Sequence, residues 1–333
     1  MSQRLFSRIV GPVLTGFLMI SSAGCHDPGQ SPPGAVRRAA AGPPPAAGYF
    51  STKGSGAWSE LPSGRRCETR VHKSDWEPRA ANARANHTMP SVAEVRSELT
   101  RRRSAVRGHN RRWERWLIPR ITGHYTGTTD EIIQWAACKW GVSDNLLRAL
   151  AEQESTWYQG LVYPDGRCVT ELGCGDLVAA PSAATRKYCD ALSRHGRDYQ
   201  IDYGTGICPE TFGIMGVKSW QDPAWGRMPE NQNGTFPFNR DSTAFNVDYR
   251  AAELRGCLEG WERWLDQTGT RDYGPDRLWG CVGAWYSGDW RTPDANKYNA
   301  QVKTILEDRR WLRPRWMREQ PPCSPRYGCP VHD

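Results

Sequence analysis

The sequence of 333 residues has little of the apolar continuity that a membrane-spanning protein requires. After residue 25, no apolar run approaches the roughly 20 residues of a transmembrane helix, which excludes a protein that crosses the membrane several times. No Cys-x-x-Cys pair occurs either, so no structural metal site is expected. Between residues 120 and 310 no alternating run of strand length appears, which predicts a mainly α-helical body.

Phenylalanine is scarce, with 7 residues against 16 Trp, so large flat rings supply much of the apolar surface. Such rings suit both core packing and stacking on sugars. Lys and Arg number 44 against 36 Asp and Glu, a net charge of +8 that favours an anionic partner such as a wall polymer or an acidic membrane surface. No groove-reading motif is present, so no nucleic-acid partner is expected, and we expect a monomer.

The amino terminus has the layout of a secretory signal peptide over residues 1–25. Two Arg and no acidic residue precede an apolar run at 9–20, which ends in Ser22-Ala23-Gly24-Cys25. This ending resembles a bacterial lipobox, in which Cys25 would be lipidated. We therefore expect an exported lipoprotein facing the cell wall or periplasm; the alternative is a secreted protein with an incidental thiol at Cys25.

Cysteine is the second indicator of an exported protein. The chain has 11 Cys, and lipidation of Cys25 leaves ten, an even number that permits five disulfides in an oxidising compartment. The pairing cannot be read from sequence. The ten candidates are Cys67, Cys138, Cys168, Cys174, Cys189, Cys208, Cys257, Cys281, Cys323 and Cys329.

Composition divides the rest of the chain into segments. Nine Arg against three Glu over 92–120 favour a basic surface helix that is solvated or contacts a wall polyanion. The predicted organisation is a flexible Pro/Ala/Gly-rich linker at 26–48, an irregular and then basic helical region at 49–120, the main domain at 121–310 with a Cys-rich insertion at 159–210, and a C-terminal tail at 311–333.

Capping and periodicity signals define helices within the main domain. Thr128 and Glu131 predict a capping box, and Gly141 predicts the end of that helix. Ser143 predicts the start of the next one, whose apolar stripe runs through Leu146, Leu147 and Leu150. Apolar spacing predicts further helices at 245–266, 277–286 and 295–310.

Glu154 continues the apolar stripe of the second helix, whereas Glu152 is predicted to point toward solvent. A carboxyl group at the end of an apolar stripe is partly desolvated, which raises its pKa toward the range of a general acid working near neutral pH. The alternative is a structural Glu that is solvated or paired with an Arg.

Four segments in order resemble soluble-lytic-transglycosylase (SLT) domains of the lysozyme-like superfamily. Residues 139–155, ending Ala-Glu-Gln-Glu-Ser, resemble the catalytic helix, in which the Glu of the Glu-Ser pair is the acid/base. Thr-Phe-Gly-Ile-Met-Gly-Val at 211–217 resembles the family's Ser-x-Gly-Leu-Met-Gln-Ile. Residues 246–254 resemble its Asn-initiated helix, and Ala-Trp-Tyr-Ser-Gly at 284–288 resembles its Ala-Tyr-Asn-Ala-Gly.

The resemblance implies a lysozyme-like helical domain with Glu154 as the catalytic residue and no metal or organic cofactor. Departures from the pattern fall in two of these segments: Gly216 stands where the family has Gln, and Trp285 and Tyr286 stand at its Tyr and Asn. The residues implied to bind substrate are Ser155, Thr211, Gly213, Ile214, Met215, Gly216, Trp285 and Tyr286.

The implied activity is that of a lytic transglycosylase, which cleaves the bond between N-acetylmuramic acid and N-acetylglucosamine in peptidoglycan and leaves a 1,6-anhydro end. One alternative is a muramidase in which a second carboxylate activates water. The candidates for that carboxylate are Asp165, Glu171, Asp176 and Glu210. The other alternative is a wall-binding protein that has lost activity on the same scaffold.

Overall fold

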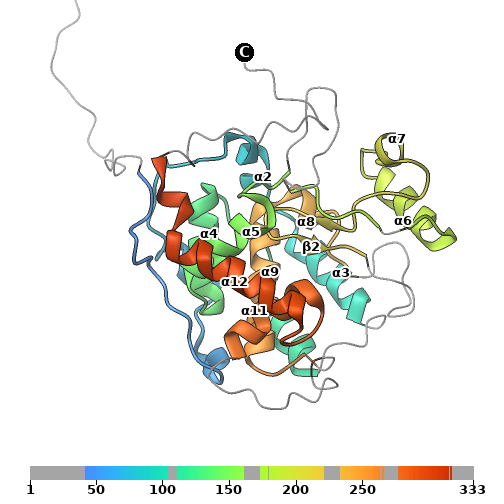
Figure 1. The fold of residues 1–333 in the computed structure, drawn as a ribbon. Helices are drawn as coiled ribbons and strands as arrows, with labels where there is room; N and C mark the ends of the chain where they lie inside the picture. The colour runs from blue at the N-terminus through green and yellow to red at the C-terminus, as the bar shows by residue number, and fades with distance from the viewer. Residues whose placement is uncertain are drawn as a thin grey trace, which may run out of the picture. The chain divides into compact units, whose positions relative to one another are not determined.

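The computed structural model describes residues 42–103, 111–160, 173–178, 180–220, 233–262, 265, 277–314 and 316 (Figure 1). The predicted signal peptide, Cys25 and most of the linker lie outside these residues. Within the described part the protein is mainly helical, as the sequence predicts, and none of its helices is long and apolar enough to cross a membrane. The longer helices are α3 (Val92–Arg103), α4 (Thr129–Trp140), α5 (Asp144–Ser155), α6 (Ala183–Ser193), α9 (Thr243–Leu258), α11 (Arg277–Ser287) and α12 (Pro293–Asp308).

Short helical turns connect these elements. They are η1 (Ala57–Glu60), α1 (Gly64–Glu68), η2 (Ala80–Asn82), α2 (Ala83–Asn86), η3 (Trp113–Leu117), η4 (Ile118–Arg120), α7 (Gln200–Tyr203), α8 (Phe238–Asp241) and η7 (Arg310–Leu312). Packing of α4 against α9 and α5, and of α12 against α11 and α5, forms the main body (Figure 1). Helix α5 therefore lies between α4 and α12.

Local signals set the ends of α4 and α5. The Thr128 side chain accepts a hydrogen bond from the Glu131 amide, Gly141 adopts the left-handed conformation (φ 58°), and Ser143 accepts from the Leu146 amide. The predicted capping box is only half formed, because the Glu131 carboxylate accepts from the amide of Ser74 (2.8 Å) in the N-terminal segment. The Glu131 carboxylate, which a complete capping box would use as its second acceptor, is therefore engaged in a tertiary hydrogen bond instead.

The predicted helix at 245–266 is shorter at its C-terminal end than expected. Helix α9 is capped by Ser242 and ends at Leu258, after which Gly260 takes a positive φ of 74°. The chain turns back there, and the Trp261 amide donates to the carbonyl of Gly256 (2.9 Å). Trp261 is nevertheless buried, since the turn returns it to the core. The two remaining predictions, α11 and α12, are confirmed within a few residues.

The segments flanking the main helices contribute to the same core. Val95, Leu99, Trp113 and Leu117 are buried, so the basic region at 92–120 has an apolar inner face beneath its arginines. At the other end of the chain, Trp311 and Trp316 are buried as well. The described part of the predicted C-terminal tail therefore packs on the body.

A small sheet corrects the expectation of no strands. Strands β1 (Thr211–Phe212) and β2 (Val217–Lys218) pair antiparallel, with Thr211 opposite Lys218. Residues 173–178 run beside β1, where the Gly213 amide donates to the Gly173 carbonyl (2.7 Å). Strands of two residues are too short to show alternation in sequence. A second cluster, built on Tyr188, Phe212, Trp220 and Phe236, lies under this region.

Three disulfides are described: Cys67–Cys138, Cys189–Cys208 and Cys257–Cys281. The first joins the irregular N-terminal region to α4, the second closes part of the insertion, and the third joins α9 to α11. Cys174 is also disulfide-bonded. The predicted Cys168, Cys323 and Cys329 lie outside the described residues.

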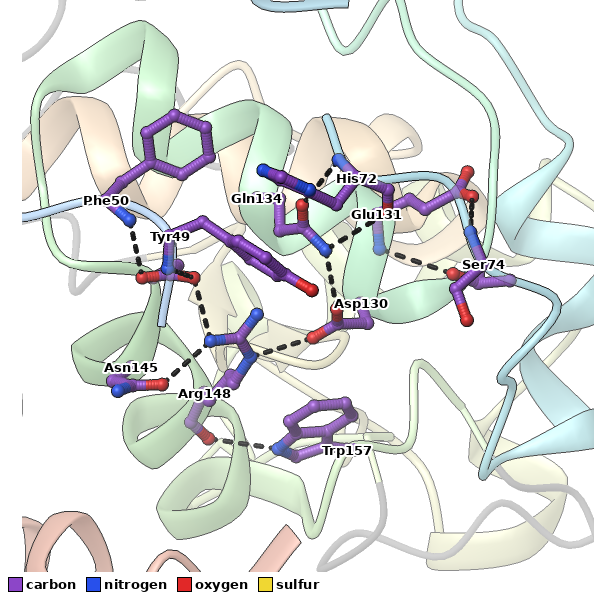
Figure 2. Close-up of polar contacts among 12 residues, drawn as sticks. Tyr49, Phe50, His72, Ser74, Asp130, Glu131, Gln134, Asn145, Arg148 and Trp157 are labelled. Atoms are coloured by element: carbon purple, nitrogen blue, oxygen red, sulfur yellow. Dashed lines mark hydrogen bonds and ion pairs between the residues drawn. The ribbon is translucent and has the colours of Figure 1, made fainter. Parts of the chain in front are cut away.

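A buried arginine links α4, α5 and the N-terminal segment (Figure 2). The Arg148 guanidinium donates to Asp130 of α4 (2.7 Å) and to Asp144 at the start of α5 (2.8 Å), and all three side chains are buried. Asp144 also accepts from the backbone amides of Tyr49 (2.9 Å) and Phe50 (3.1 Å). One cation thus organises carboxylates that fix the N-terminal segment across the first turn of α5.

Replacement of Arg148 by Met is expected to destabilise the oxidised protein by about 3–5 kcal/mol, because it leaves two buried carboxylates without their cation. Urea unfolding followed by circular dichroism measures this change. Arg101→Met is the matched control, since it breaks the exposed Arg101–Glu98 pair on α3 and should cost about 0.5 kcal/mol or less. Equal losses in the two variants would contradict the role given to Arg148.

Candidate active site

Glu154 lies in the last turn of α5, where its half-buried side chain meets α12 and the turn between β1 and β2. The Tyr298 hydroxyl of α12 donates a hydrogen bond to Oε1 of Glu154. The other oxygen, Oε2, faces Gly216. The two carboxyl oxygens therefore have different surroundings, a phenol on one side and bare backbone on the other.

Burial raises the pKa of Glu154 from its usual 4.5 to about 7. The Tyr298 hydrogen bond and the positive charge of Arg250 oppose this rise, and the negative charge of Asp176 adds to it. A carboxyl group with a pKa near 7 is protonated in a large share of molecules at neutral pH, and it loses its proton readily. Glu154 can therefore serve as an acid and then as a base in one cycle.

The neighbouring Glu152 does not face solvent as predicted. It is buried, and its Oε2 accepts a hydrogen bond from the indole nitrogen of Trp316 (2.8 Å). The C-terminal segment covers this side of α5, a contact that helical periodicity gives no sign of. Of the two carboxylates in the predicted motif, Glu152 is thus occupied in packing, and Glu154 is the one aimed at the turn.

The turn at 213–216 is held beside Glu154 by buried polar groups. The amide of Ile214 donates to Gln159 (3.1 Å), the amide of Met215 donates to Asn246 (2.8 Å), and the carbonyl of Ile214 accepts from Ser155 (3.0 Å). Each side chain satisfies a backbone group that the tight turn would otherwise leave unpaired in the core.

Asn246 of α9 is the centre of this support. Its Nδ2 donates to the carbonyls of Phe212 (2.7 Å) and Asn239 (2.8 Å), while its Oδ1 accepts from Met215. Gly213 has a φ of +83°, and an added Cβ there would lie 2.1 Å from Nδ2 of Asn246. Glycine is required at this position by both the backbone conformation and the close approach.

Gly216, one of the positions at which the chain departs from the SLT pattern, borders the carboxyl group itself. Its φ is +59°, and a Cβ built on it would lie 2.6 Å from Oε2 of Glu154. A glutamine at this position would compete with the carboxyl group for the same space. The glycine thus leaves Oε2 uncovered by any side chain at residue 216.

Aromatic side chains border the other flank of Glu154. Tyr286 stacks in parallel on Tyr298, with ring centroids 5.2 Å apart and an angle of 7° between the ring planes. Tyr286 is 63% exposed, so one face of its ring is open to solvent beside Tyr298. Trp285 is half-buried, and its ring stacks on the guanidinium of Arg250, with 4.0 Å between the ring centroid of Trp285 and Cζ of Arg250. An exposed ring beside an acid is a suitable platform for the face of a sugar.

The structure places the predicted substrate-binding residues in two groups. Those that are buried and support the turn are Ser155, Thr211, Ile214 and Met215. Those at the surface of the site are Gly216, Trp285 and Tyr286, with Gly213 shaping the backbone between them. The first group acts through the position of the turn, and only the second is open to contact by a ligand.

A second carboxylate approaches Glu154 from residues 173–178. Asp176 is exposed, its charge acts on Glu154, and its amide donates to the hydroxyl of Thr211 (2.7 Å), which fixes this segment beside β1. Glu210 is half-buried 3.7 Å from Lys218. The other two candidates, Asp165 and Glu171, lie outside the described residues.

Two residues of the site were missed by the sequence analysis, Tyr298 and Arg250. Tyr298 belongs to the buried stripe of α12, which consists of Ala295, Tyr298, Val302 and Ile305. Its hydroxyl, a polar group within this stripe, was the sequence feature that could have identified it as a site residue. Arg250 is a fully buried cation on α9, and its sequence neighbour at helical spacing, Glu253, gives no sign that the charge of Arg250 acts on Glu154. Both reach Glu154 only through tertiary packing.

Among the described residues, no three His, Cys, Asp or Glu side chains gather in a group that could hold a metal ion. The expectation of a reaction without metal or organic cofactor stays a prediction. No protein-family model matches the chain, and neither a curated protein nor a solved structure matches it.

Tyr298→Phe is expected to raise the pKa of Glu154 further above 7, because it removes the hydrogen bond that favours the carboxylate. Carbon NMR titration of protein labelled at the Glu carboxyl carbon measures this pKa, with Glu154→Gln identifying the resonance. Tyr188→Phe is the control: it removes a buried hydroxyl that donates to the carbonyl of Pro209 (2.8 Å), and it should leave the resonance of Glu154 unchanged. An unshifted pKa in Tyr298→Phe would contradict the assignment.

Proposed function

We propose that this protein is a lytic transglycosylase that cleaves peptidoglycan glycan strands on a lysozyme-like scaffold, with Glu154 as its single acid/base. The observation that carries the proposal is the half-buried carboxyl group of Glu154, with a pKa near 7, held by Tyr298 and facing a bare glycine. Its position on a helix that ends Glu-Ser, beside a Gly-Ile-Met turn, supports the same assignment.

In the first step, the protonated Glu154 gives its proton to the glycosidic oxygen between N-acetylmuramic acid and N-acetylglucosamine, and the bond from that oxygen to the muramic C1 breaks. Since Oε1 accepts from Tyr298, Oε2 is the oxygen that carries the proton. In the second step, the carboxylate takes the proton of the muramic 6-hydroxyl, whose oxygen bonds to C1. Glu154 is then protonated again, and the product is a 1,6-anhydro end.

The remaining features of the site fit a sugar polymer. The exposed ring of Tyr286 offers a stacking surface beside the acid, and the net charge of +8 favours an anionic wall polymer or membrane surface. Described disulfides support residence in an oxidising compartment. An exported lipoprotein anchored through Cys25, or a secreted protein, remains part of the proposal.

Glu154→Gln is expected to reduce the release of 1,6-anhydro-muropeptides from purified peptidoglycan by at least about 100-fold, because the amide can neither give nor take the proton. Mass spectrometry of soluble muropeptides from the full chain and the variant measures this. Full release by the variant would overturn the assignment. Retention of the wild type on the wall pellet with no release would indicate a binding protein instead.

The same variant has a stability signature that separates loss of the acid from loss of the fold. The folded pKa of about 7 exceeds the usual 4.5, so the folded state binds more protons between these pH values, and wild-type stability falls as pH rises through this window. Glu154→Gln lacks this loss. The difference in thermal midpoint, variant minus wild type, should therefore be more positive at pH 8 than at pH 4.

Hydrolysis is the second candidate function, and Asp176 is the observation that favours it. An exposed carboxylate whose charge reaches Glu154 could take a proton from water, whose oxygen would then bond to C1 and leave a reducing end. If the enzyme works this way, Asp176→Asn lowers the ratio of reducing to anhydro ends in the product spectrum. Asp190→Asn, an exposed carboxylate on α6, is the matched control and should not change that ratio. An unchanged ratio in Asp176→Asn would exclude hydrolysis through Asp176 and leave transglycosylation as the proposed reaction.

A further inference from the structure

The chain leaves α5 through a strained turn directly after the Glu154-Ser155 pair. Thr156 and Trp157 both have a left-handed φ, of 53° and 68°, although neither is glycine. A helix that ends in this conformation usually has glycine there, and the conformation is an outlier for β-branched and bulky side chains. Backbone strain of this kind persists only where the surrounding structure over-determines it, and it clusters at functional sites.

The helix itself binds only the amide side of this turn. The amides of Thr156 and Trp157 both donate to the carbonyl of Ala151. The carbonyls of the same two residues are bound by side chains of the N-terminal region: Nε of Arg79 donates to Thr156 (2.9 Å), and Nδ2 of Asn82 donates to Trp157 (2.7 Å). We call this pair of side chains, Arg79 and Asn82, the clamp.

The clamp is itself fixed in the core. Arg79 and Asn82 have 2% and 0% of their surface exposed. The guanidinium of Arg79 lies on the ring of Trp316, 3.8 Å from its centroid, and Nη1 donates to the Trp316 carbonyl (3.2 Å). Nδ2 of Asn82 also donates to the hydroxyl of Thr129 (3.0 Å), the first residue of α4. The clamp therefore holds the turn from a packed position rather than from the surface.

Residues 156–159 also reach the turn at 213–216. Oδ1 of Asn82 accepts from the amide of Gln159 (2.9 Å), and the Gln159 side chain accepts from the amide of Ile214 (3.1 Å). Asn82 thus contacts a segment that is joined at one end to the last turn of α5 and hydrogen-bonded at the other to the turn that faces the acid.

We propose that Arg79 and Asn82 are positioning residues that hold residues 156–159 in the left-handed turn and thereby set the place of Glu154 opposite Gly216. This inference rests on the proposed function, in which the acid must meet the glycosidic oxygen at that turn. The clamp binds the carbonyls that the helix leaves unbound, so it resists unwinding of the last turn of α5, which carries the acid. Part of the irregular N-terminal region thereby belongs to the apparatus of the active site.

Arg79→Met removes the donor to Thr156 and keeps most of the side-chain volume. Release of the last turn of α5 should let water reach Glu154, so its pKa should fall from about 7 toward 4.5, by about half a unit or more. NMR titration of the labelled Glu carboxyl carbon measures this shift, with Glu154→Gln identifying the resonance. The rate of anhydro-muropeptide release at saturating peptidoglycan should fall about 10-fold or more, because small misplacements of a catalytic group cost this much.

Thr156→Gly separates the clamp from the charge and the packing of Arg79. Glycine adopts the left-handed conformation without strain, so it has less need of the clamp. Thr156→Gly alone should raise the thermal midpoint. In the Arg79→Met background it should restore most of the pKa and of the rate, although the guanidinium is still absent. If Arg79→Met does not fold alone, recovery of the fold in the double variant supports the proposal, and a lower midpoint in Thr156→Gly alone contradicts it.

Arg255→Met is the matched control, because Arg255 is a buried arginine that binds the end of another helix. It donates to the carbonyls of Trp140 (3.0 Å) and Gly141 (2.8 Å) at the end of α4. Its loss should lower the thermal midpoint and leave the pKa of Glu154 unchanged. An unchanged pKa in folded Arg79→Met, no recovery through Thr156→Gly, or the same shift in Arg255→Met would overturn the proposal. If the wild type releases no muropeptides, the proposed function fails, while the titration still decides whether the clamp positions Glu154.

Discussion

The ion-paired guanidinium of Arg148 is the interaction on which the arrangement of the site depends. It joins Asp130 of α4 to Asp144 of α5, and Asp144 fixes the N-terminal segment through two backbone amides (Figure 2). Charges buried in this way stabilise a structure only when every partner is in place. These contacts hold α5 against α4 and the N-terminal segment, and Glu154 lies in the last turn of the helix that they hold.

From that fixed helix, a second set of polar groups positions the turn opposite Glu154. Ser155, Gln159 and Asn246 bind three successive backbone groups of the turn, so the bare Gly216 is held against the carboxyl group. Apolar side chains could have filled the same volume, but they would not have specified one conformation of a tight turn with left-handed glycines. The polar core here determines geometry more than it adds stability.

Two buried arginines, Arg148 of α5 and Arg250 of α9, illustrate different uses of charge. Arg148 contacts two carboxylates directly, and the result is a rigid link between helices. The charge of Arg250 acts on Glu154 without an ion pair among the described contacts, and burial keeps that carboxyl group close to the point of losing its proton. A direct ion pair would have fixed Glu154 as a carboxylate and removed its use as an acid.

The sequence by itself determined the helical class, the ends of α4 and α5, and Glu154 as the candidate acid, because capping and periodicity act between residues a few positions apart. It also supplied, through resemblance, the segments that the structure brings together around that carboxyl group. Tertiary structure alone decided that Glu152 accepts a hydrogen bond from Trp316, that α9 ends at Leu258, and that the Tyr298 hydroxyl reaches Glu154. These outcomes depend on contacts between residues far apart in the chain, and the hydrogen bonds and desolvation that set a pKa arise only when those residues are packed together.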